Sequence, residues 1–256
     1  MAPTREELRE HLIRSAIAGS VQTPAGDVVR KAQMVSDGEE EASFGLKGMA
    51  RYGRGDVLAE IRRQFGWEPT PGESPFARTY IEPDLLLDEF DRARDRIATA
   101  GREGQRVILA TGHPTGVFAL HAQVGAALRS AGAKLLRPGD GLPVRVRDAE
   151  RMVRFVLDVG TLSSGANLYH THSARPMGVV LDDLDGDVDL VIADHGWAGT
   201  AAQRGFDVIG IADINDPALP MAKAEGRAGI VLGMDDNVLP RHYDLVAEYL
   251  TAGLKS

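Results

Sequence analysis

Short apolar runs alternate with amphipathic segments through the second half of the chain. The first run, residues 107–111 (Val-Ile-Leu-Ala-Thr), is apolar almost throughout and is followed by a glycine turn. Such runs are typical of strands buried on both faces of a parallel sheet, and apolar residues at three- and four-residue spacing between them indicate helices. The pattern predicts strands at residues 107–111, 133–136, 154–157, 167–170, 190–193, 208–212 and 230–232. It predicts helices over residues 114–131, 174–184, 197–205, 217–226 and 240–253.

The N-terminal part of the chain is more polar and is interrupted by glycine and proline. Thr4, with Glu7 three residues later, forms a capping box and predicts a first helix. A second helix is expected over residues 56–65. Residues 68–75 contain three prolines, which exclude regular structure, so we expect a linker or a lid-like loop there. The sequence of residues 23–54 does not allow a secondary structure to be assigned.

The alternation of strands and helices favours an α/β fold with three layers. In this fold, helices cover both faces of a doubly wound, mostly parallel sheet. A long helix that begins at Pro83 precedes the first strand, and proline suits the first turn of a helix. We therefore divide the chain into a helical N-terminal segment or cap (residues 1–80) and an α/β catalytic core (residues 81–256).

Polar residues follow several of the predicted strands directly. In an open parallel sheet, ligands bind outside the carboxyl ends of the strands. The segments at these ends are residues 111–116, 170–175, 194–197, 213–217 and 233–237. Four of the seven histidines lie in them: His113, His170, His172 and His195. One edge of the sheet is therefore expected to collect imidazole, carboxylate and hydroxyl groups.

A divalent metal ion is the cofactor that these residue types predict. The chain has no cysteine, which excludes thiolate ligands and a thiol nucleophile. Imidazole nitrogen and carboxylate oxygen suit divalent ions, and we leave the choice open among Mg, Mn, Co, Ni, Fe and Zn. The candidate ligands are Asp194, Asp213, Asn215, Asp216 and His172. The candidate catalytic residues, as ligands or as general acid and base, are His170, His172, His195 and Asp194.

Structural roles compete with some of these assignments. Asp216 precedes a proline at a predicted helix start and is equally suited to cap that helix. The same alternative applies to His113. His170 and His172 are separated by one residue, so on a strand both imidazoles face the same side. The convergence of several strand ends favours a functional site over independent helix caps.

Two features indicate an anionic ligand. The glycine-bearing turn at residues 111–116 leads into a predicted helix, whose first amides are suited to bind an anion. Arg175 lies in the first turn of another predicted helix, where a cation opposes the helix dipole. The candidate phosphate-binding residues are Thr111, Gly112, His113, Thr115 and Arg175.

Composition and charge argue against some classes of binding partner. The net charge is −8, which argues against a broad surface that tracks nucleic-acid phosphates. No stretch approaches the roughly 20 apolar residues that a membrane-spanning helix needs. The N-terminus lacks the basic start and apolar core of a signal peptide. We expect a cytoplasmic protein without nucleic-acid or membrane partners and leave a homo-oligomer open.

Four motifs resemble a bacterial protein family known simply as phosphatase. They are Thr111-Gly-His-Pro-Thr-Gly116, Leu168-Tyr-His-Thr-His-Ser173, Ala193-Asp-His-Gly-Trp-Ala198 and Ala212-Asp-Ile-Asn-Asp-Pro217. The resemblance spans nearly the whole chain and implies hydrolysis of phosphate esters. In architecture alone, the chain is also similar to the damage-control metal phosphatases, whose diagnostic motifs are not evident in it.

Residues and resemblance together predict a metal-dependent phosphohydrolase that removes phosphate from a small phosphorylated metabolite. Two alternatives remain open at this point. One is a metal-dependent isomerase or lyase that acts on a sugar phosphate, because a metal at the same edge would polarise a carbonyl equally well. The other is a protein that binds a phosphorylated ligand without turnover.

Overall fold

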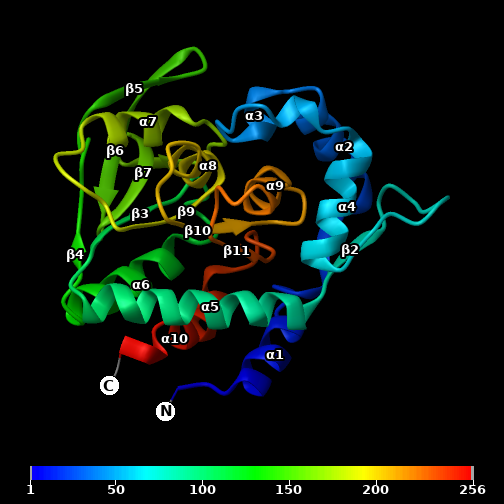
Figure 1. The fold of residues 1–256 in the computed structure, drawn as a ribbon, viewed down its shortest axis with the longest axis horizontal. Coiled ribbons are helices and arrows are strands. Elements are labelled where there is room, and N and C mark those ends of the chain that lie inside the picture. The colour runs from blue at the N-terminus through cyan, green and yellow to red at the C-terminus, as the bar shows by residue number, and fades with distance from the viewer. Residues whose placement is uncertain (1, 255–256) are drawn as a thin grey trace.

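The computed structural model of the chain describes residues 2–254, and a large sheet forms its centre (Figure 1). The strands are ordered β11–β10–β9–β3–β7–β6–β5. In that order they span Ile230–Gly233, Val208–Ala212, Leu190–Asp194, Arg106–Ala110, Val159–Ser164, Ala149–Val156 and Pro143–Val146. Two short strands lie off this path: β4 (Lys134–Leu135) pairs with β3, and β8 (Asn167–Tyr169) pairs with β7. The ladders that join β3, β4, β7, β9, β10 and β11 are parallel, which confirms a mostly parallel sheet.

Helices on both faces of the sheet complete the three predicted layers (Figure 1). One layer contains α5 (Pro83–Arg102), α6 (Phe118–Ser130) and α10 (Asp244–Leu250). The other contains α7 (Arg175–Asp182), α8 (His195–Gln203) and α9 (Ala218–Ala224). Every residue of β9 and β10 is buried between these layers, as their continuous apolar sequences require. The α/β fold class is therefore confirmed.

The order in which strands are added to the sheet reverses between β3 and β9. From β3 the chain continues to β4 and β7 on one side, and only later to β9, β10 and β11 on the other side. Ligands of open α/β sheets bind at such a point, outside the carboxyl ends of the strands. The two strands that flank it end next to Thr111 and at Asp194.

The N-terminal part contains a small sheet in addition to helices. α1 (Arg5–Arg14) begins after Thr4 with the predicted capping box. The other helical elements are α2 (Ala25–Ser36), α3 (Glu40–Ser43), the 3-10 turn η1 (Met49–Arg51) and α4 (Arg54–Phe65). The antiparallel pair β1 (Gly19–Pro24) and β2 (Arg78–Ile81) was not predicted from the sequence, because both strands are short and contain few apolar residues. Residues 68–75 are irregular, as their prolines predict. The domain division at residue 80 stays a prediction.

Some predicted elements differ from the structure. Residues 154–156 fall in β6 and residue 157 lies in the turn after it, whereas residues 167–169 form β8. Both strands are antiparallel to β7. The sequence pattern predicts no strand over the residues of β7, so it does not predict the hairpins on either side of that strand. The predicted helix 240–253 is divided into η2 (Pro240–Tyr243), α10 and η3 (Ala252–Leu254).

The 20-residue helix α5 carries charged side chains along its whole length. Within residues 2–254, none of the helices has both the length and the apolar character that crossing a membrane would require.

Candidate active site

A cavity of about 470 Å³ opens at the carboxyl ends of the parallel strands. Its wall contains four imidazoles and five carboxylates: His113, His170, His172, His195, Asp27, Asp213, Asp216, Asp235 and Asp236. Thr23 and Lys31 reach the same cavity from β1 and α2. The N-terminal part and the core therefore build this cavity together.

Asp194, the last residue of β9, is fully buried and holds the two flanking strand ends together. The Thr111 hydroxyl donates to its Oδ2 atom, and the Gly112 amide donates to Oδ1 over 2.6 Å. Nδ1 of His195 lies 2.9 Å from the same Oδ1. Burial alone would raise the pKa of Asp194, but the bonds from His195 and Thr111 lower this pKa to about 2. Asp194 is therefore ionised, and its oxygens are engaged within the protein.

His195 is held in one orientation by its backbone and by Asp194. Its φ is +46°, in the left-handed region that non-glycine residues rarely adopt. With Nδ1 directed at Asp194, Nε2 lies 3.3 Å from Asp216 Oδ2 and 3.5 Å from Asp236 Oδ2. Burial opposes charge on the ring, yet Asp216 and Asp194 outweigh it and raise the pKa of His195 well above its ordinary value. His195 thus connects the buried Asp194 with the carboxylates of the cavity.

His170 and His172 reach the cavity from a strand that returns toward the sheet edge. β7 extends beyond the end of β3, and β8 runs back along β7 in the antiparallel direction. After β8, the Thr171 amide donates to the Gly112 carbonyl. The two Nε2 atoms lie 3.2 Å apart, and Lys31 Nζ lies 3.5 Å from His172 Nδ1. Burial, together with neighbouring charged groups, lowers the pKa of His170 to about 4 and that of His172 to about 3. Both rings are therefore neutral at pH 7 and can act as metal ligands.

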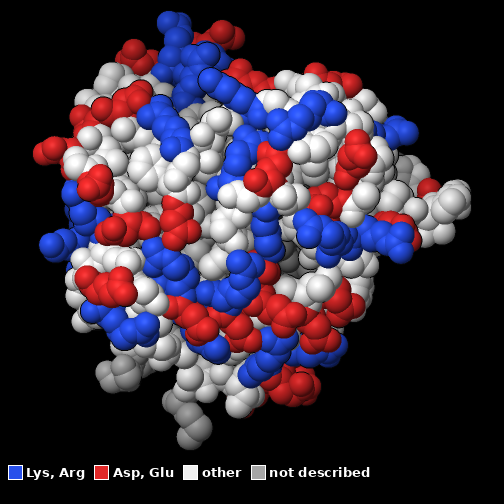
Figure 2. All heavy atoms as spheres, viewed as in Figure 1, with Lys and Arg blue, Asp and Glu red and all other residues white. Residues whose placement is uncertain are grey.

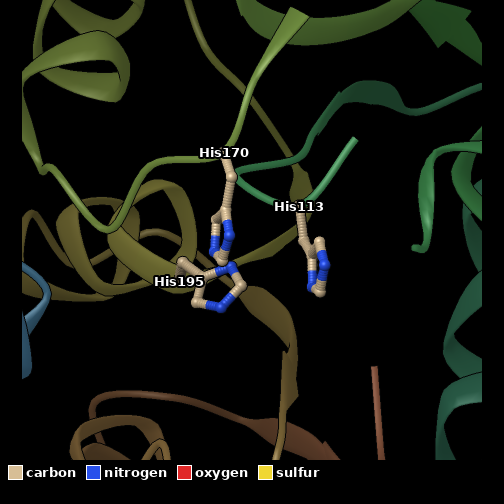
Figure 3. Close-up of side chains that lie close together, drawn as sticks. All are labelled: His113, His170 and His195. Atoms are coloured by element: carbon tan, nitrogen blue, oxygen red, sulfur yellow. The ribbon is translucent and has the colours of Figure 1, made fainter. Parts of the chain in front are cut away.

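His113 completes the histidine cluster (Figure 3). Its ring stacks on that of His170 with 4.5 Å between centroids, and the His195 ring lies 5.2 Å from that of His170. His113 Nδ1 lies 3.2 Å from Asp236 Oδ1 without the alignment of a hydrogen bond. Burial opposes protonation of His113, but Asp236 raises its pKa overall.

The carboxylates on the far side of the cavity repel one another. Burial raises the pKa of Asp213 well above its ordinary value, and the charges of Asp236, Asp235 and Asp216 raise it further. Burial also raises the pKa of Asp235, with Asp236 adding to the shift. Burial opposes ionisation of Asp216, but the charge of His195 lowers its pKa overall. A bound cation would relieve this repulsion.

Two sets of side chains converge closely enough to hold a metal ion. Ligand atoms of His172, His195 and Asp216 lie within 4.8 Å of one another, and so do those of His113, His170 and His195. Asp213 lies at the same wall, with Oδ2 accepting from the Thr23 hydroxyl and Oδ1 accepting from the Ile214 amide.

The structure brings most of the sequence-predicted site residues together. Those that line the cavity are His113, His170, His172, His195, Asp213, Asn215 and Asp216. Asp194 does not line it, and Thr111 and Gly112 contact the Asp194 carboxylate. Thr115 is exposed and lines neither this cavity nor the adjoining one, whereas Arg175 lines the adjoining cavity.

Sequence reasoning gave no role to Asp235, Asp236 or Lys31. The two aspartates follow β11, in the segment 233–237 that was placed at the same sheet edge, so their position was the available signal. Lys31 lies on α2, in a part of the chain whose sequence permitted no assignment, and nothing in its surroundings along the sequence points to the site.

Comparison with known proteins agrees with the resemblance of the strand-end motifs. A model of the family described as Phosphatase matches residues 3–255. Phosphatase SCO2771 of Streptomyces coelicolor is 40% identical to this chain over 261 residues, covering 99% of this chain and 98% of the relative. The match includes every strand end described above. The chain therefore belongs to the Phosphatase family.

Proposed function

We propose that this phosphatase is a metal-dependent phosphohydrolase that removes phosphate from a small phosphorylated metabolite. The observation that carries the proposal is the convergence of His172, His195 and Asp216, whose ligand atoms lie within 4.8 Å of one another. This convergence lies at the point where open α/β sheets bind their ligands.

The residues of the cavity fit a divalent cation. Asp236 Oδ2 is buried and has no hydrogen-bond partner among the described residues, and burial and neighbouring carboxylates raise the pKa of Asp213. Both features indicate a missing positive charge. His172, His195 and Asp216 would hold the metal, with Asp213 and Asn215 as further oxygen ligands. A bound divalent ion polarises a phosphoryl oxygen and lowers the pKa of a bound water.

The chain's own residues orient and complete this site. Asp194 fixes the His195 ring through Nδ1, so Nε2 remains directed at Asp216, an arrangement common behind metal-binding histidines. Thr111 and Gly112 hold Asp194 in place, which is a positioning role, and their predicted contact with phosphate stays a prediction. His170 lines both cavities, and its neutral Nε2 can accept a proton from water.

A small substrate suits the size of the site. The volume of about 470 Å³ falls within the range of pockets for small molecules. Thr23 and Lys31, from the N-terminal part, contribute to its wall. A cytoplasmic location, the absence of a nucleic-acid partner and the oligomeric state stay predictions from the sequence.

The proposal is tested by a phosphate-release screen against small phosphate esters, with Mg, Mn, Co, Ni, Fe and Zn added in turn. We expect free phosphate from at least one ester. Conversion of a sugar phosphate without release of free phosphate would contradict the proposal and support an isomerase or lyase. Stabilisation by phosphorylated ligands without any product would support a binding protein.

A further inference from the structure

A second cavity, of about 760 Å³, adjoins the one that contains the carboxylates. The two share Lys31, His170 and His172. A molecule bound by its phosphate on one side of the histidine pair would therefore extend into the second cavity. The volume lies within the range of pockets that enclose small organic molecules.

Three cations in the wall of the second cavity lack an acidic partner. Among residues 2–254, Lys31, Arg151 and Arg175 form no ion pair with a carboxylate. The guanidinium of Arg175 donates to the Arg145 carbonyl over 3.3 Å. Of the acidic residues in the wall, Glu41 is already paired with Arg147, which leaves Glu40. Unpaired cations gathered in a chain of net charge −8 indicate an anionic ligand.

The ion pair of Arg147 and Glu41 connects the turn between β5 and β6 with α3, and both residues line this cavity. Figure 2 shows Lys and Arg side chains, with some acidic ones, gathered over the part of the surface where Figure 1 draws the β5 hairpin.

An aromatic and apolar surface lies beside these cations. The guanidinium of Arg151 lies over the Tyr169 ring at 4.4 Å from its centroid, and Leu162 and Val146 line the same wall. A guanidinium that lies over an aromatic ring can still direct N–H groups at an anion.

We propose that the second cavity binds the organic part of the phosphate ester and selects substrates that carry a second anionic group. This inference rests on the proposed function, because it places the scissile phosphate among the histidines and carboxylates. The planar part of the substrate packs near Tyr169, and its carboxylate or second phosphate contacts Arg151 and Arg175. In this arrangement Arg175 contacts the second anionic group, whereas the sequence assigned it to the phosphate that is removed, and that assignment stays a prediction.

Calorimetric titration with non-hydrolysable phosphonates tests this inference without requiring turnover. The probes are phenylphosphonate, 4-carboxyphenylphosphonate and benzene-1,4-diphosphonate, added to the protein as purified. We expect both probes that carry a second anionic group to bind at least about 10-fold more tightly than phenylphosphonate, because each gains charge-assisted hydrogen bonds. A larger gain for one of them identifies the second group as carboxylate or phosphate.

Arg175→Gln and Arg151→Gln are expected to reduce this affinity ratio to less than about 3-fold. The control is Arg154→Gln, on the same strand as Arg151 but on its opposite, exposed face, and it should keep the full ratio. Arg175 is exposed, so its variant should fold even if Arg151→Gln does not.

A ratio near one in the wild type, or a ratio that both variants leave unchanged, would overturn the inference. So would an Arg175→Gln variant that weakens all three probes equally, because Arg175 would then bind the shared phosphonate. Selective binding without phosphate release from any ester would contradict the proposed function and retain the subsite. Phosphate release without selective binding would support the proposed function and contradict the subsite.

Discussion

The carboxylate of Asp194 lies 2.9 Å from Nδ1 of His195, the residue that follows it in the chain. Neighbouring side chains on a strand point to opposite faces, so this contact needs a local change of backbone direction. The change occurs at His195, where φ is +46° and α8 begins. The strained backbone thus directs the imidazole back over Asp194 and its Nε2 toward Asp216.

Asp194→Asn should impair activity without unfolding the protein. The amide group has nearly the same shape, but it can donate a hydrogen bond to Nδ1 and so favours the wrong tautomer of His195. We expect a loss of roughly 10–100-fold in activity or metal affinity, as is typical when the partner of a metal-binding histidine is replaced. Phosphate release and metal content, measured on the same sample, check this. Asp187→Asn, at an exposed position away from the site, serves as the control. Unchanged activity of Asp194→Asn would show that the contact has no role.

His172→Ala should abolish turnover and leave the fold intact. His172 is one of three residues whose ligand atoms converge, so its removal opens the candidate metal site. We expect at least a 100-fold loss of phosphate release, within the range for removing a catalytic acid or base. The circular dichroism spectrum should stay that of the wild type. His242→Ala, near the start of α10, should retain activity. Comparable losses in the two variants would point to a general effect on stability.

Gly112→Ala should destabilise the fold and disturb the site together. A methyl group on Gly112 would overlap the Thr171 carbonyl oxygen and lie 3.2 Å from Asp194 Oδ1. Relief of this overlap would move the segment that carries His170 and His172, at a cost of about 1–3 kcal/mol in unfolding free energy. Urea denaturation measures this cost. Gly55→Ala, in α4 with open space around it, should be neutral or stabilise by up to about 1 kcal/mol. Equal stabilities of the two variants would contradict the close approach at Gly112.

Acidification should destabilise the metal-free protein through His172. The folded pKa of His172 is lowered to about 3 from 6.5. Below pH 6.5 the unfolded chain takes up a proton that the folded protein excludes, so stability is present above pH 6.5 and falls as the pH is lowered. The loss attributable to His172 between pH 7 and pH 5 is on the order of 2 kcal/mol.

The measurement is the free energy of unfolding at several pH values in the presence of a chelator. His172→Gln should remove this part of the pH dependence. An identical slope in His172→Gln and the wild type would argue against a neutral, buried His172.

Much of the fold follows from the sequence because its central strands are apolar on both faces. The continuous runs of β9 and β10 have no polar position that faces solvent, so their burial between helices is the only stable arrangement. The hairpins around β7 were harder to predict. Residues Thr161, Ser163 and Ser164 give that strand a polar sequence, and its pairing depends on contacts with β6 and β8 rather than on its own composition.

The sequence predicts where the site lies in the fold more readily than it predicts the contacts between the side chains of the site. Strand ends meet at one edge of a parallel sheet, so the sequence alone brings together His113, His172 and Asp213. The role of Asp194 was not accessible, because its partners Thr111 and Gly112 are distant in sequence and only the pairing of β3 with β9 brings them to it. Lys31 was not accessible for a similar reason, since only the packing of α2 over the cavity brings it to His172.

The central claim is that the histidines and carboxylates hold a metal ion that phosphate-ester hydrolysis requires. The most direct measurement is phosphate release from 4-nitrophenyl phosphate before and after chelation, with metal content determined on the same sample. We predict that chelation removes both the metal and the activity, and that one divalent ion restores the activity. A folded, metal-free protein that releases phosphate at the full rate would contradict the claim.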